Sequence, residues 1–209
     1  MGYSTLIDII GSTIIGGLLL LILLRMNATA VQNNYDYNGE RIVQQNLVDV
    51  VRLIEYDFRK IGYCNGYTNL PKQSTAIIHA DSSSITFLTD VPTTSNPYGD
   101  GVVDTLKYYL GSTSQLTSTP NPNDRILYRV VNHNAAAGSN LGVTQFKLTY
   151  YDSDGDIMTN LPASPPFGIA SIQIDVAVEN PAAYGNNYSV EKRALWRQIR
   201  LATRNFKIR

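Results

Sequence analysis

The chain is poor in cysteine and in charged residues, and each shortage excludes a class of protein. Cys64 is the single cysteine among 209 residues, so no internal disulfide can form and the chain is not a disulfide-stabilised scaffold. Charged residues make up only 16% of the chain, and the 17 basic residues balance the 17 acidic ones. A net charge of zero provides no general attraction to nucleic acid or to anionic lipid.

The patterns that mark catalytic centres are missing as well. His79 and His133 are far apart, and neither has a second metal ligand at a suitable spacing. The sequence contains no glycine-rich nucleotide-binding motif and no nucleophile-elbow pattern. We therefore predict that the chain is not an enzyme, that it takes no small-molecule substrate, and that nucleic acid is not among its partners.

One long apolar run dominates the first 25 residues. Residues 6–24 read LIDIIGSTIIGGLLLLILL, and Arg25 ends the run. About 19 residues of helix cover roughly 28 Å, which is close to the thickness of the hydrocarbon core of a bilayer. We predict a retained membrane helix in residues 1–25. A cleaved signal peptide is the alternative, because residues 28–30 (Ala-Thr-Ala) resemble a cleavage site, although no basic residue precedes the run.

Four residues inside this run are candidates for a functional role. Asp8 is costly in lipid, which makes it a candidate by default. Gly11, Gly16 and Gly17 are small enough to let membrane helices approach one another closely. The alternative for the glycines is the ordinary composition of membrane helices, in which glycine is more frequent than in soluble helices.

Two segments of different character follow the apolar run. Residues 26–39 are polar and rich in Asn near their end, which predicts a loop or a weak point between two helices. Residues 40–61 predict an amphipathic helix, with Gly62 as its C-cap. Apolar residues recur there at spacings of three and four and share one face: Val43, Leu47, Val50, Ile54, Phe58 and Ile61. That stripe needs a sheet or another helix to cover it.

Beyond Gly62 the apolar period changes to two, which is typical of strands. Strands are predicted at residues 76–80, 84–90, 102–110, 126–132, 143–151 and 169–179, whereas residues 193–206 fit either a helix or a strand. The intervening turns are too short for helical crossovers, so the sheet should be antiparallel. The predicted fold class is α+β, with a membrane helix (residues 1–25), a linker and amphipathic helix (26–62), and a β-rich domain (63–209).

This order of elements resembles the type IV pilin superfamily, in which a hydrophobic N-terminal half-helix continues into an amphipathic half packed on a β-sheet. Several stretches are similar to PilW-like minor pilins and J-type pseudopilins: residues 55–64 (EYDFRKIGYC), 84–87 (SITF), 101–110 (GVVDTLKYYL), 125–129 (RILYR) and 200–205 (RLATRN). The resemblance implies a structural subunit of a type IV pilus or a type II secretion-like filament. Its partners would be like or related pilin subunits. Its location would be the inner membrane, with an extracytoplasmic β domain, or an extracellular filament.

The resemblance also assigns roles near the N-terminus. Gly2 and Tyr3 match the processing junction, with Tyr3 as a methylated first residue. The family's acid would then stand at position 7, and Asp8 lies one residue later. The resemblance implies that this acid pairs with the N-terminal amine of a neighbouring subunit and sets the register. Arg25 and Arg41 follow the span and by charge favour an N-terminus outside the cytoplasm, whereas the family inserts with the N-terminus inside, and we follow the family.

Two charged clusters suggest ligands. Asp152, Asp154 and Asp156 place three carboxylates in one short turn, which predicts either a calcium site or an ordinary hairpin turn. Basic residues near the C-terminus are candidates for contact with phosphate, acidic subunits or lipid headgroups, or else they belong to a solvated edge strand: Arg193, Arg197, Arg200 and Arg204. No cofactor other than calcium is expected.

Two other functions stay open at this point. The first is a single-pass accessory subunit that holds a periplasmic β domain beside the larger partners of a membrane complex. The second is a calcium-dependent adhesin. The first residue of the mature protein separates the pilin hypothesis from the accessory subunit, and the response to a chelator tests the adhesin.

Overall fold

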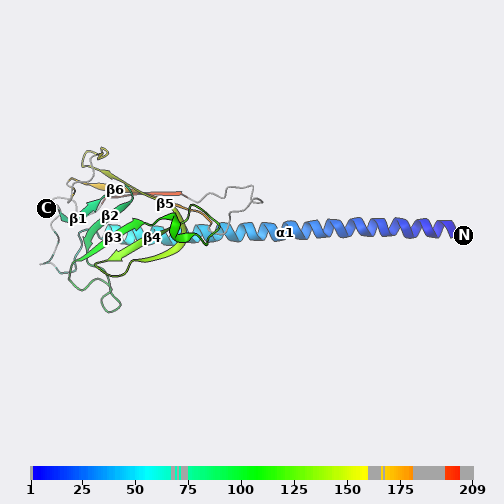
Figure 1. Ribbon diagram of the computed structural model, residues 1–209, viewed down its shortest axis with the longest axis horizontal. Helices are drawn as coiled ribbons and strands as arrows, with labels where there is room; N and C mark the ends of the chain where they lie inside the picture. Colours follow the sequence, from blue (N-terminus) through cyan, green and yellow to red (C-terminus); the bar gives the residue numbers. More distant parts are fainter. Residues whose placement is uncertain are drawn as a thin grey trace. The chain divides into compact units, whose positions relative to one another are not determined.

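The computed structural model describes residues 2–66, 69, 71, 75–159, 166, 168–180 and 196–202. They form one long helix and a curled antiparallel sheet of seven strands, so the predicted α+β class is confirmed (Figure 1). The elements are α1 (Gly2–Arg59), β1 (Ile77–Ala80), β2 (Ser84–Thr89), β3 (Asp104–Leu110), the 3-10 helix η3 (Thr113–Leu116), β4 (Arg125–Val131), β5 (Ala137–Tyr151), β6 (Ser171–Val178) and β7 (Trp196–Ala202). The chain divides into two compact units, Met1–Arg41 and Ile42–Arg209.

The predicted loop at residues 26–39 is wrong, because α1 continues through this segment without a break. Asn and Gly cost up to about 1 kcal/mol each relative to Ala in a helix. A break would give up backbone hydrogen bonds and require a second, unfavourable helix nucleation, and no proline forces one. A side-chain pair also supports the helix, because Gln32 Nε2 donates to Asp36 Oδ1 one turn later at 3.2 Å.

The C-terminal part of α1 is the predicted amphipathic helix. Its apolar stripe is confirmed as buried, and Ile61, just past the helix, is buried with it: Val43, Leu47, Val50, Ile54, Phe58 and Ile61. The helix ends at Arg59, and Gly62 takes a positive φ of 74°. The Gly62 N–H donates to the Leu88 carbonyl at 2.8 Å, so the predicted C-cap also directs the chain onto β2.

The seven strands form a simple meander in which each strand pairs with the next along the chain. Every predicted strand overlaps an observed one, and the ambiguous segment at residues 193–206 contains strand β7. β5 begins earlier than predicted because its first half pairs with β4 and its second half with β6. The change of partner lies at Val143, beside Gly142, whose φ is 71°.

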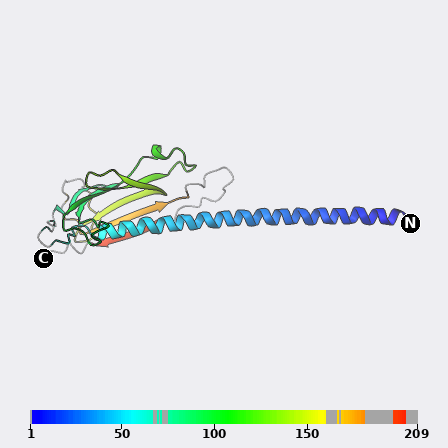
Figure 2. The ribbon, with the colours of Figure 1, turned by 90° about the horizontal axis from the view of Figure 1, so that it is seen from below.

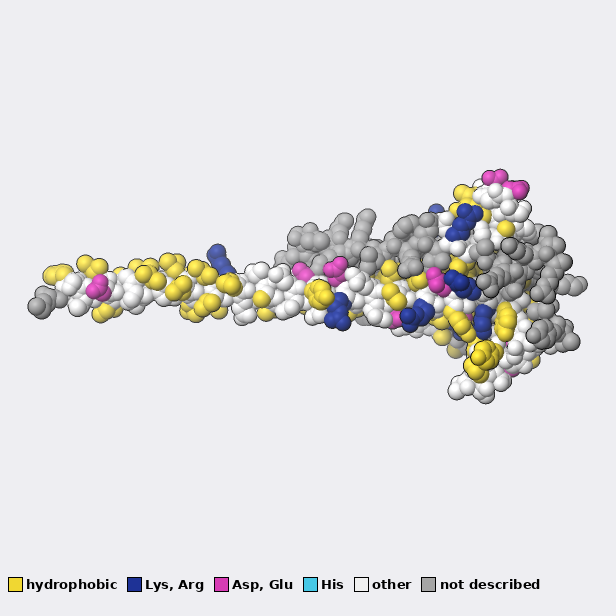
Figure 3. All heavy atoms as spheres, turned by 180° about the vertical axis from the view of Figure 1, so that it is seen from behind, with side chains coloured by type: hydrophobic (Ala, Val, Ile, Leu, Met, Phe, Trp, Pro, Cys, Tyr) yellow, Lys and Arg dark blue, Asp and Glu magenta, His cyan; other side chains and the backbone are white. Residues whose placement is uncertain are grey.

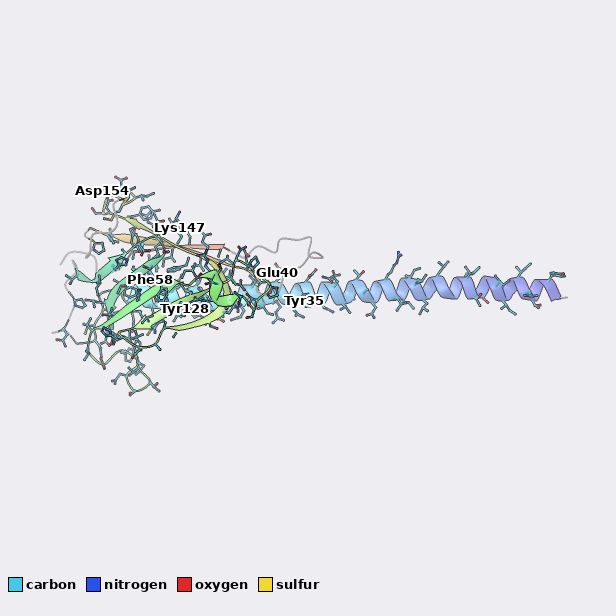
Figure 4. All side chains as sticks on the ribbon, in the orientation of Figure 1. Tyr35, Glu40, Phe58, Tyr128, Lys147 and Asp154 are labelled. Atoms are coloured by element: carbon cyan, nitrogen blue, oxygen red, sulfur yellow. The ribbon has the colours of Figure 1, made fainter. Side chains whose placement is uncertain are left out.

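The core lies between the C-terminal part of α1 and one face of the sheet (Figure 2). Phe58, labelled in Figure 4, is at its centre: its ring centroid is 5.4 Å from that of Phe87 and 5.7 Å from that of Tyr108. Alternate residues of the strands complete the core, among them Ile85, Leu106, Phe146, Leu148, Tyr150, Ile172, Ile174 and Val176. The apolar stripe of the helix is therefore covered by the sheet, within the unit Ile42–Arg209.

Candidate functional site: the exposed apolar segment of α1

Residues 6–24 expose their apolar side chains in every direction around the helix. Each Leu and Ile in this segment is between 52% and 68% exposed. Figure 3 shows hydrophobic side chains along the N-terminal part of α1. In the part of the chain that the structure describes, α1 is the one helix long and apolar enough to cross a bilayer. Because exposed apolar area is unfavourable in water, this surface needs lipid or other helices around it.

The hydroxyl groups of this segment are already satisfied by its own backbone. Thr5, Ser12 and Thr13 each donate to the carbonyl three residues earlier, at 3.0, 2.9 and 2.9 Å. A hydroxyl bonded in this way leaves no unpaired donor in an apolar environment. The polar residues of the segment, other than Asp8, are therefore compatible with lipid.

Asp8 and the glycines lack a role inside the single chain. No hydrogen bond or ion pair joins the Asp8 carboxylate to any residue that the structure describes. A Cβ added at Gly2, Gly11, Gly16 or Gly17 would meet nothing within 4 Å. Tyr3, beside Gly2, is exposed in the first turn of the helix. These side chains and glycine positions are therefore open to lipid or to another molecule.

The acidic turn at Asp152, Asp154 and Asp156 is a hairpin turn. Asp152 Oδ1 accepts from the backbone N–H groups of Asp154 at 3.0 Å and Asp156 at 2.9 Å, and Gly155 takes a positive φ of 90°. Asp154 points outward at the tip (Figure 4). Within the described ranges, no group of three Asp, Glu, His or Cys side chains could hold a metal ion. The turn chemistry accounts for these residues, and the structure does not gather them into a calcium site.

The basic C-terminal cluster is only partly described. Arg193 and Arg204 lie outside the described residues, and Arg197 lies in β7, paired with Val176 of β6. Arg200 Nε donates to Ser171 Oγ at 3.2 Å. Its guanidinium lies 4.1 Å from the centre of the Tyr151 ring, a cation–π contact. Arg200 therefore packs on its own sheet.

Sequence reasoning missed a buried ion pair between α1 and the sheet. Asp57 lies in the apolar stripe and is only 2% exposed. Arg129 Nε donates to Asp57 Oδ2 at 2.6 Å and Nη2 donates to Oδ1 at 3.3 Å, so the pair is bidentate. The hydroxyl of Tyr108 donates a short hydrogen bond to the same carboxylate. In the sequence, only the presence of an acid beside the apolar stripe indicated a buried charge, and it did not identify Arg129 and Tyr108 as the partners.

The protonation of this cluster follows from its surroundings. Burial, together with the charge of Asp57, raises the pKa of Tyr108 above its ordinary value. Burial alone would lower the pKa of Arg129, but the hydrogen bonds and charge of Asp57 outweigh it and raise the pKa. Both donors therefore keep their protons at neutral pH, and both stabilise the Asp57 carboxylate.

A second buried acid connects the loops that follow α1 and β2. Asp90 accepts backbone hydrogen bonds from Asn65 at 3.0 Å, Asp100 at 3.0 Å and Gly101 at 2.9 Å. A Cβ added at Gly99, whose φ is 110°, would lie 2.2 Å from this carboxylate. The sequence predicted only a turn here, because the donors come from segments far apart in the chain. Cys64 is buried in the same region.

The comparisons with known proteins do not assign the chain. No protein-family model matches it, and no curated protein matches it either.

Proposed function

We propose that this chain is a structural, non-enzymatic pilin-like subunit, anchored in the inner membrane by residues 6–24 with its β domain outside the cytoplasm. In the assembled state, these residues pack against the same segment of identical or related subunits. The product is a filament of the type IV pilus or type II secretion kind, or the tip of one.

One observation carries the proposal: a single continuous helix has a first part that exposes apolar side chains on every side and a second part whose one apolar face packs on an antiparallel sheet. A membrane anchor alone would not need α1 to continue unbroken from the apolar segment into the core of the domain. A filament subunit would use both parts of such a helix, the first to pack against other subunits and the second to form part of the core of the domain.

The residues without a role in the single chain fit this assembly. Gly11, Gly16 and Gly17 offer close approach to a neighbouring helix. Asp8 is an acid in an apolar surface and has no partner among the described residues, so its partner would come from another subunit, and such a pair mainly sets register. On this proposal, cleavage after Gly2 makes Tyr3 the first residue. The N-terminal amine of Tyr3 in a neighbouring subunit is then the partner of Asp8.

The proposal is tested by deleting residues 6–24. The packed core lies within Ile42–Arg209, so the shortened protein should be soluble, monomeric and cooperatively folded by circular dichroism. It should form no filaments by electron microscopy, whereas the full chain should form them. Filaments made by the shortened protein would contradict the proposal.

A second experiment separates the pilin-like subunit from the alternative, a single-pass accessory subunit of a larger membrane complex. Mass spectrometry of the native protein should find a methylated Tyr3 as the first residue. An intact Met1, together with isolated particles in micrographs, would support the accessory subunit instead.

A third experiment addresses Asp8 directly. Asp8→Ala should reduce the assembled fraction while leaving the melting temperature of the domain unchanged. Asp49→Ala is the matched control, because Asp49 lies on the same helix and accepts only an exposed hydrogen bond from Gln45, at 3.0 Å. Equal assembly of both variants would remove Asp8 from the mechanism.

A further inference from the structure

The outward face of β4 carries apolar side chains where an antiparallel sheet usually carries polar ones. On the side that faces α1, this strand holds Arg129, which is paired with Asp57. On the outward side it holds Ile126, Tyr128 and Val130, and all three are half-buried. A sheet that packs one face on a core normally places polar residues on its other face. This reversal leaves an apolar and aromatic surface outside the core.

Two tyrosine rings stack on this surface. Tyr109 of β3 pairs in register with Tyr128 of β4. The preceding residue of β3, Tyr108, and the following residue of β4, Arg129, both bind Asp57 of α1, so the two stacked tyrosines point away from the core. Their ring centroids are 5.0 Å apart and the ring planes differ by 23°. Figure 4 labels Tyr128 on β4.

Glycines on both sides make room for the Tyr128 ring. Gly138 of β5 pairs with Tyr128, and a Cβ added there would lie 2.9 Å from Cδ1 of the ring. A Cβ added at Gly111, just after β3, would lie 2.9 Å from Cε2, the ring atom opposite Cδ1. A side chain at either position would force the ring to move, whereas glycine lets it lie close to the sheet. The half-buried rings of Tyr109 and Tyr128 form what we call the tyrosine platform.

Polar groups at the tyrosine platform are available for a ligand. In the part of the chain that the structure describes, no hydrogen bond or ion pair engages the hydroxyl of Tyr109, the hydroxyl of Tyr128 or the ammonium of Lys107. Lys107 is exposed on the outward side of β3, and its Nζ lies 5.1 Å from the centre of the Tyr109 ring. It is the one charged side chain among the outward positions of β2, β3 and β4, which are residues 84, 86, 88, 105, 107, 109, 126, 128 and 130.

These groups fit a sugar ring better than a nucleic acid strand. The face of a tyrosine ring is negative and the axial C–H groups of a pyranose are weakly positive, so the two faces attract each other. Phenolic hydroxyls and an ammonium can hydrogen-bond to sugar oxygens. A single-stranded nucleic acid needs a groove of basic side chains along its backbone as well as stacking rings, and these outward positions offer only Lys107.

We propose that the tyrosine platform binds a pyranose ring that carries a carboxylate, as a uronic acid does. Tyr109 and Tyr128 supply the stacking surface, and the Lys107 ammonium pairs with the carboxylate. Charge complementarity favours an acidic sugar, because the outward positions of β2, β3 and β4 hold one base and no acid. The site is separate from residues 6–24, so binding does not depend on filament assembly.

The test uses the full chain in a detergent without a sugar headgroup. The probe is a hyaluronan hexasaccharide, in which glucuronate alternates with an acetylated amino sugar, and isothermal titration should detect its binding. Laminarihexaose, a neutral glucan of the same length, should bind about two- to fivefold more weakly, which is the contribution of one exposed ion pair.

Variants of the platform should weaken binding of the hyaluronan hexasaccharide without unfolding the domain. Tyr109→Leu removes one stacking ring and should weaken it about three- to tenfold. The matched control is Tyr98→Leu, at an exposed tyrosine in the loop between β2 and β3, and it should bind as the unaltered chain does.

A second pair of variants tests the charge. Lys107→Met should lower the affinity for the hyaluronan hexasaccharide to that for laminarihexaose, because only the acidic sugar uses the ammonium. Lys147→Met, at an exposed lysine of β5, is its control and should keep the preference. Because Lys107 is exposed, this test does not depend on how well Tyr109→Leu folds.

Four results would overturn the proposal. The first is no binding heat with either sugar at millimolar concentration. The second is binding of the hyaluronan hexasaccharide that Tyr109→Leu and Lys107→Met leave unchanged. The third is tighter binding of a thymidine hexanucleotide than of either sugar, which would make the platform a nucleic-acid site. The fourth is a loss of assembly in Tyr109→Leu with an unaltered titration, which would make the platform a contact between copies of the chain.

Discussion

Residues 6–24 and residues 43–58 belong to the same helix but use their apolar side chains in opposite ways. In the first segment apolar residues surround the helix, and Ile22 is 53% exposed. In the second they form one stripe, and Ile54 is 0% exposed. Backbone hydrogen bonding makes both segments helical, while the distribution of apolar residues decides what each can pack against. A stripe suits one face of a sheet, whereas an all-round surface suits lipid or a bundle of helices.

Two of the acids of this helix, Asp8 and Asp57, differ in the same way. Asp57 has Arg129 and Tyr108 as partners within the chain. Asp8 has none among the described residues. A charged group in an apolar setting needs a partner. For Asp57 the described residues of the same chain provide one, and for Asp8 they do not.

The largest contrast should come from one substitution made in both segments. Ile54→Ala should lower the free energy of unfolding by about 2–5 kcal/mol, because it leaves a cavity in a closed core. Ile22→Ala should change it by less than about 0.5 kcal/mol, since that side chain has no neighbours in the domain. Urea unfolding in detergent measures both, and similar losses would show that the segments are not energetically separate.

Removal of the buried acid should have the next largest effect. Asp57→Ala leaves Arg129 without its charge partner and should lower the free energy of unfolding by about 3 kcal/mol. This is the lower end of the range for a buried pair, because the Arg129 side chain is still 24% exposed. Replacing both residues by Leu should recover much of the loss. Asp49→Ala should be neutral, and a comparable loss there would contradict the role of the pair.

Replacing glycine by alanine should change stability in opposite directions in the two units. Gly99→Ala forces a Cβ to 2.2 Å from the Asp90 carboxylate at a φ of 110° and should cost about 1–3 kcal/mol. Gly16→Ala meets open space within a helix and should favour the helix by about 1 kcal/mol without affecting the domain. Thermal unfolding followed by circular dichroism distinguishes the two outcomes.

The smallest effect concerns alkaline pH. The folded chain holds Tyr108 protonated because its pKa is raised, whereas the unfolded chain ionises it near its ordinary value of 10.0. The unfolded state then binds fewer protons, so stability present below pH 10 should fall as the pH rises above it. Tyr108→Phe should make that fall shallower than in the unaltered chain.

Local signals were sufficient for much of the fold. The stripe from Val43 to Ile61, the cap at Gly62 and the order of strands follow from periodicity and turn residues, which act over a few positions. The loop expected at residues 26–39 is wrong because local polarity does not overcome the cooperativity of a long helix that contains no proline. The identity of β7 stayed open because the periodicity of residues 193–206 fits both structures.

The sequence by itself determined that the first 25 residues make an apolar helix, that residues 43–61 have one buried face, and that an antiparallel sheet covers it. Only the tertiary structure decided which polar groups meet. Asp57 and Arg129 are 72 residues apart, and the Asp90 carboxylate accepts from backbone groups of two separate loops. The reason is physical: periodicity reports which face of an element is buried, whereas the pairing of buried charges depends on strand register and loop paths.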